Sequence, residues 1–223
     1  MTDALEIRQL IDNWVLWRDA GFWDRFATVW HEDGWMTATW FQGPASRFIE
    51  VSRDGFERGV NILHSQGAHT SDIAGTRAIA QTKMEILQRA HVDNILVDVV
   101  VTGRFYDFLE KRPSTALGTG PSTALGTGPS TALGTGARWG IVRRQPIYEK
   151  DRLDPIDPAA TLMLDPQRLA QFPEGYRHLA YLQSKIGFDV KKNLPGLKGA
   201  AVQKLYAEGA AWLAGAPTPG EPL

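Results

Sequence analysis

The chain contains no cysteine among its 223 residues, which excludes disulfides, thiolate zinc sites and a cysteine nucleophile. The absence fits a reducing compartment, and we expect a cytoplasmic protein. An excess of charge is missing too, since the formal net charge is −1 and the pI is about 6.5. A balanced charge gives no general attraction to nucleic acid or to an anionic membrane, so we expect neither as a partner.

Long apolar runs and common catalytic motifs are also absent. No stretch approaches the roughly 20 apolar residues that span a bilayer, and the N-terminus has neither the basic start nor the apolar run of a secretion signal. No His-x-His or His-x-x-x-His spacing favours a metal, and no Gly-x-Ser-x-Gly supports a serine nucleophile. We therefore expect no metal site and no cofactor.

Tryptophan, in contrast, is abundant. The chain has 8 tryptophans, and those in the first forty residues are Trp14, Trp17, Trp23, Trp30, Trp35 and Trp40. Dense aromatic packing is the ordinary interpretation, and an aromatic-lined ligand cavity is the functional one. The two overlap, because most small-molecule pockets are lined by apolar and aromatic side chains.

Hydrophobic spacing predicts helices over residues 3–20, 22–31 and 46–65, with a strand over residues 35–41. After Gly67 the period changes to two. It then predicts three long strands, over residues 78–92, 95–110 and 138–149. Gly103, inside the second of these, indicates a bulge or a strong bend, and bent antiparallel strands can curl around helices.

A perfect repeat separates the last two predicted strands. The octapeptide PSTALGTG occurs three times in tandem over residues 113–136 and carries no charge. Its Gly, Ser and Thr content is that of a flexible linker. We expect a solvated hairpin loop without a catalytic role, arising from a recent duplication or an engineered insert.

The remaining chain is predicted to be a helical extension over residues 151–215, followed by a disordered tail at 216–223. The order of elements predicts an α+β fold in which helices pack on one face of a curved antiparallel sheet. It lacks the strand–helix alternation of a parallel-sheet nucleotide-binding fold.

Three motifs resemble the SnoaL-like and scytalone dehydratase-like group of the nuclear transport factor 2-like superfamily. Residues 19–26 are similar to its D-x-x-x-W-D-x-L/F stretch, residues 67–70 to the segment with a histidine that opens the sheet, and residues 103–107 with 138–141 to its Gly-Arg-Tyr-x-Asp hairpin. The resemblance covers about residues 3–150, without the repeat. It implies one cone-shaped domain over residues 1–150, with the sheet wrapped around the N-terminal helices.

The superfamily contains several reaction types and also pure binding modules, so the fold cannot fix the function. The resemblance implies a cofactor-independent lyase or isomerase of the dehydratase type. Its substrate would be a small, largely apolar hydroxy-carbonyl or cyclic compound, bound in an aromatic-lined pocket. The alternatives are a ligand-binding or oligomerisation module without chemistry and the small subunit of a ring-hydroxylating oxygenase.

The resemblance also suggests catalytic residues. It places the functional aspartate at Asp19, makes Asp24 a helix-start residue, and places an inward-facing histidine at His69, with His64 as a nearby rival. Histidine can act as a base near neutral pH when an acidic partner orients it. We expect Asp19 and His69 to lie within hydrogen-bond or one-water distance, with His69 taking a proton next to a carbonyl.

A third catalytic position stays open between two residues. His91 follows His69 at a separation similar to that of the second histidine of scytalone dehydratase, whereas Glu85 would match an acidic residue of the bile-acid dehydratases. The stretch before Asp19 holds tryptophans where the dehydratases have a tyrosine, and an indole cannot act as an acid. The expected substrate contacts are Trp14, Trp40, Met84 and Glu85.

The predicted strand over residues 95–110 is apolar on both faces, so both faces should be covered. The helical extension could cover one of them within the chain or exchange with a partner. Since two-fold pairing is the commonest closed symmetry, we expect a homodimer or a higher homo-oligomer.

Overall fold

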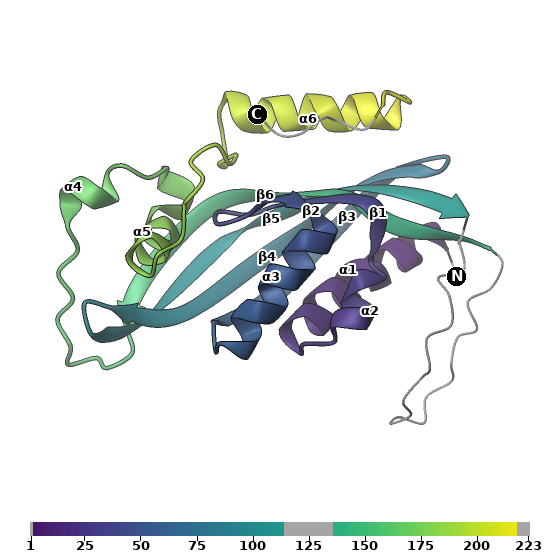
Figure 1. Ribbon diagram of the computed structural model, residues 1–223. Coiled ribbons are helices and arrows are strands. Elements are labelled where there is room, and N and C mark those ends of the chain that lie inside the picture. Colours follow the sequence, from purple (N-terminus) through teal and green to yellow (C-terminus); the bar gives the residue numbers. More distant parts are fainter. Residues whose placement is uncertain (1, 114–135, 218–223) are drawn as a thin grey trace, which may run out of the picture.

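The computed structural model describes residues 2–113 and 136–217. Its centre is a curved six-stranded sheet (Figure 1). The N-terminal helices pack against one face of this sheet, and the last helix lies across the other face (Figure 1). The predicted α+β class is confirmed. The repeat loop and the predicted disordered tail fall mostly on residues 114–135 and 218–223, outside the described residues.

Three helices precede or interrupt the sheet: α1 (Asp3–Asp19), α2 (Trp23–Ala27) and α3 (Ala45–Glu57). The inward side of α1 is fully buried and carries Ile7, Ile11 and Trp14. The helix ends at Asp19, and Gly21 follows with φ 72°, a conformation that glycine adopts at little cost. The predicted first helix is therefore confirmed, and its end fixes the position of Asp19.

The six strands are β1 (Trp30–Thr37), β2 (Gln42–Pro44), β3 (Asn61–Ala74), β4 (Arg77–Val92), β5 (Ile95–Pro113) and β6 (Ala137–Pro155). Their spatial order is β2-β1-β6-β5-β4-β3. All neighbouring pairs are antiparallel except β1 with β6, which are parallel. The sheet is thus mixed, whereas the sequence predicted an antiparallel one. The second helix is also shorter than predicted, because Trp30 already belongs to β1.

The predicted distortion at Gly103 is confirmed. The pairing of β5 with β6 shifts register between Thr102 and Gly103. A Cβ atom at Gly103 would lie 2.2 Å from the carbonyl oxygen of Ile147, so only glycine fits where the two strands approach here. The bend lets the long strands curve around the helices.

The helix predicted over residues 46–65 is wrong in its second half. α3 ends at Glu57, Gly59 takes a left-handed φ of 82°, and β3 begins at Asn61. Apolar spacing through Val60 continued the helical pattern, but glycine in this conformation is a common helix terminator. The consequence is functional, because His64 lies on a strand at the sheet edge instead of on a helix.

The C-terminal extension contains α4 (Pro166–Leu169), a short 3-10 helix at Glu174–Tyr176, α5 (Arg177–Lys185) and α6 (Ala200–Leu213). α5 packs into the same core as the N-terminal helices and β-strands. The expected division at residue 150 therefore does not separate two cores, since β6 runs on to Pro155 and α5 returns to the first core.

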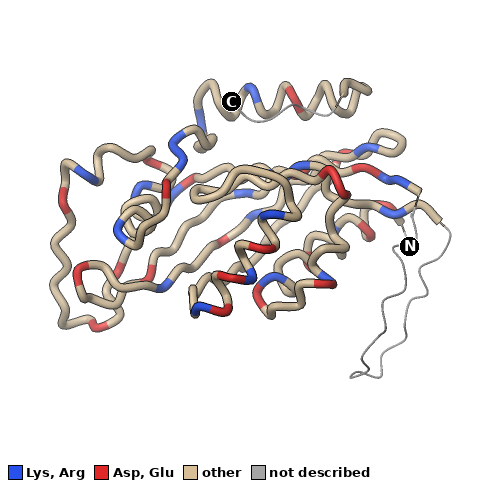
Figure 2. Tube along the Cα trace, in the orientation of Figure 1, with Lys and Arg blue, Asp and Glu red and all other residues tan. Residues whose placement is uncertain are grey.

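α6 covers the outer face of the sheet. Its Val202, Leu205 and Trp212 are buried against a second apolar cluster formed by Tyr106 and Phe108 with residues of β4 and β6. Both faces of β5 are thus covered within one chain, and the expected homo-oligomer stays a prediction. Basic and acidic residues are interspersed along the chain (Figure 2). No helix among the described residues is long and apolar enough to cross a membrane.

Candidate active site

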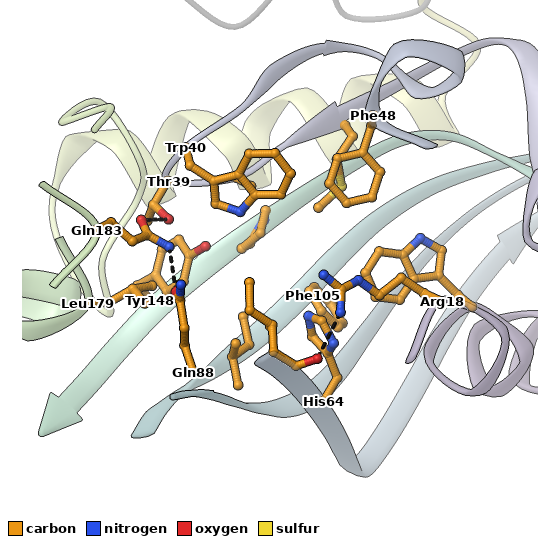
Figure 3. Close-up of a pocket in the computed structure, with 16 residues that line it drawn as sticks. Arg18, Thr39, Trp40, Phe48, His64, Gln88, Phe105, Tyr148, Leu179 and Gln183 are labelled. Atoms are coloured by element: carbon orange, nitrogen blue, oxygen red, sulfur yellow. Dashed lines mark hydrogen bonds between the residues drawn. The ribbon is translucent and has the colours of Figure 1, made fainter. Parts of the chain in front are cut away.

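A cavity lies between the inner face of the sheet, the N-terminal helices and α5 (Figure 3). Its volume is about 30 Å³, room for a water molecule or two, and we call it the inner cavity. The walls are mainly aromatic and aliphatic, and they include Trp14, Trp40, Phe48 and Phe105. Polar side chains gather in two groups at opposite sides of this apolar space (Figure 3).

The first polar group is built on Asp19, the last residue of α1, and His64 of β3. One carboxylate oxygen of Asp19 accepts the backbone N–H of His64 at 2.6 Å, and the other lies 2.8 Å from the imidazole Nδ1. The His64 side chain is 8% exposed and that of Asp19 is 13% exposed. Because an ionised carboxylate only accepts, Nδ1 must carry the hydrogen, which leaves Nε2 as the basic nitrogen.

The environment keeps the imidazole neutral and the carboxylate ionised. Burial lowers the pKa of His64, and the positive charges of Arg18 and Arg144 lower it further, against the opposing effect of Asp19. Burial alone would raise the pKa of Asp19, but the hydrogen bond and charge of His64 together with Arg18 outweigh it and lower that pKa. The pair therefore presents an unprotonated Nε2 near neutral pH.

Arg18 fixes this pair from the side. Its Nη1 donates to Asp19 at 3.1 Å and to the carbonyl oxygen of Ile62 at 2.8 Å, which ties the end of α1 to β3. The residue is only 7% exposed, and its Nε has no hydrogen-bond partner among the described residues. Arg18 is thus a buried cation whose Nη1 holds Asp19 and β3 while its Nε–H lacks a partner.

A second buried arginine lies under the aromatic wall. Arg144 of β6 forms two hydrogen bonds to Asp107 of β5, at 2.7 and 2.8 Å, and both side chains are fully buried. Its guanidinium lies 4.3 Å from the ring centre of Trp14 and 4.1 Å from that of Phe105. This ion pair supports the cavity wall and adds positive charge near His64.

The second polar group links the sheet to the C-terminal extension. The Thr39 hydroxyl donates to Gln183 of α5 at 2.6 Å, and Gln183 in turn donates to Oε1 of Gln88 on β4 at 3.0 Å. The Nε2 of Gln88 is left as a donor at the cavity wall (Figure 3). Tyr148 lies beside Thr39, and burial raises the pKa of its hydroxyl, which stays a neutral donor.

The expected pairing of Asp19 with His69 is wrong. His69 lies farther along β3, where its Nδ1 is 2.8 Å from the hydroxyl of Thr82. His64 takes the expected place, because the strand begins before it and brings it level with the end of α1. The resemblance placed the inward-facing histidine at His69 and left His64 as its rival, whereas the structure brings His64 to Asp19.

The other predicted positions divide between wall, core and surface. Trp14 and Trp40 line the inner cavity as expected. Met84 is buried in the core without lining the cavity. Glu85 is exposed, because strand residues alternate between faces and its neighbours in β4 point inward. His91 is exposed at the end of β4, so neither third candidate reaches Asp19.

Sequence reasoning named His64 only as a rival of His69, and it missed Arg18, Gln88, Tyr148 and Gln183. A signal existed for Gln88, since His64 and Gln88 are 24 positions apart, close to the 22 that separate His69 and His91. Applied to His64, the separation of 22 ends at Ile86, two positions before Gln88 on the same face of β4. For Gln183 there was no signal, because the extension lies beyond the motifs.

A larger cavity of about 230 Å³ adjoins the inner one and shares Arg18, Trp40 and Ile62 with it. We call it the outer cavity. It lies between α3 and the segment around Phe188. In residues 2–113 and 136–217, no three histidine or acidic side chains are grouped in a way that could hold a metal ion.

Comparisons with known proteins agree with this architecture. The SnoaL-like domain family matches residues 1–144. An uncharacterised protein of Emericella nidulans is 32% identical over 96% of this chain and 87% of its own length, and pea pathogenicity protein 2 of Fusarium vanettenii is 29% identical over 87% and 75%. The crystal structure of LinA superposes with a TM-score of 0.50 at 11% identity, covering 72% of this chain and 93% of LinA, a likeness of fold alone.

Proposed function

The chain belongs to the SnoaL-like domain family, and from that premise we propose that it is a dehydratase-type lyase in which His64 is the general base. The fold and family are compatible with a small-molecule dehydratase or isomerase role or with ligand binding. The observation that favours chemistry is the double contact of Asp19 with His64, at 2.6 and 2.8 Å. A carboxylate that fixes the tautomer and orientation of a cavity-lining imidazole is a recurring device of proton abstraction.

A hydrogen-bond donor, the amide of Gln88, lies across the cavity from the base His64. No hydrogen bond from the described residues reaches Nε2 of His64, so the nitrogen is available to a substrate. Across the cavity, Gln88 has its Oε1 engaged by Gln183, which aims its amide N–H groups away from that contact. A carbonyl oxygen bound to Gln88 Nε2 would be stabilised as charge develops on it, because a preorganised donor in an apolar cavity is effective there.

On a β-hydroxy carbonyl substrate the step balances as follows. Nε2 of His64 takes the proton from the carbon next to the carbonyl, and the electron pair moves toward the carbonyl oxygen held by Gln88. The electrons return to form the carbon–carbon double bond while the carbon–oxygen bond of the hydroxyl breaks. The imidazolium gives its proton to the departing hydroxyl, which leaves as water and restores neutral His64.

The inner cavity is small, so at most the reacting end of a substrate can enter beside His64, and side chains of the wall must move to admit it. The body of the molecule would occupy the outer cavity, which Arg18, Trp40 and Ile62 connect to it. This favours a substrate with a compact reacting group on an apolar body. We infer that dehydration, with its small leaving group, suits this site better than removal of a large group.

A direct test uses the aldol adduct of benzaldehyde and acetone, a β-hydroxy ketone whose dehydration yields the conjugated enone benzylideneacetone. We expect the wild type to raise the ultraviolet absorbance of the enone above the background rate, and His64→Gln to lose about 100-fold or more of that rate. His69→Gln is the matched control, because it removes a histidine from the same strand outside the cavity. Equal rates for His64→Gln and the wild type would exclude His64 as the base.

The second candidate is passive ligand binding. The nearly filled inner cavity favours it, since a site of about 30 Å³ admits little more than water without side-chain movement. Saturable binding of the same ketone without turnover, unchanged in His64→Gln, would support this function over catalysis.

A further inference from the structure

The outer cavity has an unusual charge pattern. Eleven residues line it, two of them are arginines, Arg18 and Arg58, and none is acidic. No described residue forms an ion pair with Arg58, which lies exposed just after α3. The remaining wall is mostly apolar and includes Phe41, Val51 and Phe188. An apolar cavity with positive charge and no negative lining residue is suited to an anionic group on an apolar body.

Two residues that line the outer cavity each carry a buried polar atom without a hydrogen-bond partner. Ser52 of α3 is 4% exposed and its hydroxyl has no hydrogen bond among the described residues. The Nε of Arg18, a residue 7% exposed, is likewise unpartnered while Nη1 is engaged by Asp19 and Ile62. Buried polar groups are usually hydrogen-bonded, so these two donors have hydrogen-bonding capacity left for a ligand atom.

We propose that the outer cavity is a subsite for a carboxylate carried on an apolar body. The Ser52 hydroxyl and the Arg18 Nε–H can both donate to carboxylate oxygens, and a carboxylate offers acceptors only. Arg58 supplies a positive charge at the rim that is not already balanced. A neutral amide of the same shape would bring two N–H groups and no negative charge, and the two arginines offer no acceptor for those N–H groups.

The place of this subsite defines a substrate class. Arg18 borders both cavities, so a carboxylate held in the outer cavity directs the other part of the molecule toward His64. This step rests on the proposed function, whereas carboxylate binding itself does not. The substrate would be a small apolar acid whose reacting carbon lies away from its carboxylate.

Calorimetry with octanoate and octanamide tests the subsite without any turnover. We expect the wild type to bind octanoate about tenfold more tightly than octanamide, the size of effect that charge-assisted hydrogen bonds to a buried carboxylate produce. The double variant Ser52→Ala, Arg58→Gln should lose most of this preference. Arg53→Gln is the matched control, because Arg53 is an exposed arginine of α3 outside the cavity lining.

The outcomes separate the two proposals. Equal binding of octanoate and octanamide to the wild type, or a preference that survives in the double variant, would overturn the carboxylate subsite. His64→Gln should bind octanoate like the wild type. A retained octanoate preference together with absent dehydration would leave the subsite standing and remove the proposed catalysis.

Discussion

The carboxylate of Asp19 holds His64 by two atoms at once, the backbone nitrogen at 2.6 Å and the imidazole Nδ1 at 2.8 Å. The same two contacts recur between Asp151 and His178, again at 2.6 and 2.8 Å. The environments differ, because the side chain of His178 is 26% exposed at the start of α5 and that of His64 is 8% exposed beside the cavity. His64 lines the inner cavity, and Asp19 lies behind it at the end of α1.

Asp19→Asn should disturb the orientation of His64 while leaving substrate binding nearly unchanged. The amide is nearly the same size as the carboxylate, but an NH2 donor replaces one of the two accepting oxygens, so it can favour the wrong tautomer and leaves the imidazole without a negative partner. We expect kcat for the β-hydroxy ketone to fall about 100-fold or more while substrate binding changes little. Steady-state kinetics of Asp19→Asn against the wild type check this. A kcat within a factor of about two of the wild type would contradict an orienting role for Asp19.

Stability should depend on the protonation of His64. Its pKa is lowered in the folded state, so as pH falls below the ordinary histidine value of about 6.5 the unfolded chain gains a proton that the folded chain refuses. The free energy of unfolding therefore decreases as pH falls from about 6.5 to the lowered pKa of the folded state.

Urea unfolding at several pH values measures the slope of the free energy of unfolding against pH. We expect His64→Gln to show a smaller loss of stability than the wild type over that window. The pKa values of His31 and His69 are lowered as well, mainly by burial, so part of the slope will remain. His91→Gln, which removes an exposed histidine, serves as control. An identical slope in His64→Gln and the wild type would show that His64 is not held neutral.

Much of this fold could be predicted from the hydrophobic periodicity of the sequence and from the glycines that end its helices. The long strands after Gly67 alternate over many residues, and α1 is marked by spacing and by Gly21. The predicted aspartate, Asp19, lies at the site because its place depends on the end of a helix that was predicted correctly. The choice between His64 and His69 could not be made from the sequence, because apolar spacing carried the helix prediction past Gly59 and only the tertiary fold shows that β3 starts at Asn61.

The second polar group could not be predicted. Gln183 reaches Gln88 across 95 positions, and a glutamine on a helix carries no mark of such a partner. The parallel pairing of β1 with β6 could not be predicted either, because nothing in the sequence of β1 indicates which strand it pairs with or in which direction.

Gly103→Ala should destabilise the sheet. The added Cβ would lie 2.2 Å from the Ile147 carbonyl oxygen, so the backbone of β6 must move. We expect a loss of about 1–3 kcal/mol and a melting temperature lower by several degrees for a chain of this size. Gly67→Ala is the control, because its Cβ would only meet Lys83 at an ordinary 3.5 Å. Equal melting temperatures for the two variants would contradict the tight approach at Gly103.

Replacing residues 114–136 by Asn-Gly should leave the fold intact. β5 and β6 are paired up to Pro113 opposite Ala137, and a two-residue turn can join antiparallel strands at such a position. Closing a shorter loop costs less entropy, by about 0.6 kcal/mol for each halving, so stability should be unchanged or somewhat higher. Thermal unfolding checks this. A melting temperature lower by more than about 8 °C would show that the repeat stabilises the domain.

Removing residues 198–223 should expose the outer face of the sheet. Trp212 of α6 is 1% exposed, Arg77 lies 3.9 Å from its ring centre, and Tyr106 and Phe108 pack against the same helix. An uncovered apolar patch of this kind favours association. We expect light scattering at micromolar concentration to give a higher mass for the truncated chain than for the full chain.

The same measurement tests the expected homodimer. For the full chain, a homodimer predicts a mass of about twice 24.7 kDa, and a mass near 24.7 kDa would contradict it. Lys204→Ala, an exposed change on α6, should behave like the full chain. A truncated protein that keeps the mass of the full assembly would show that α6 is not needed to keep this face from associating.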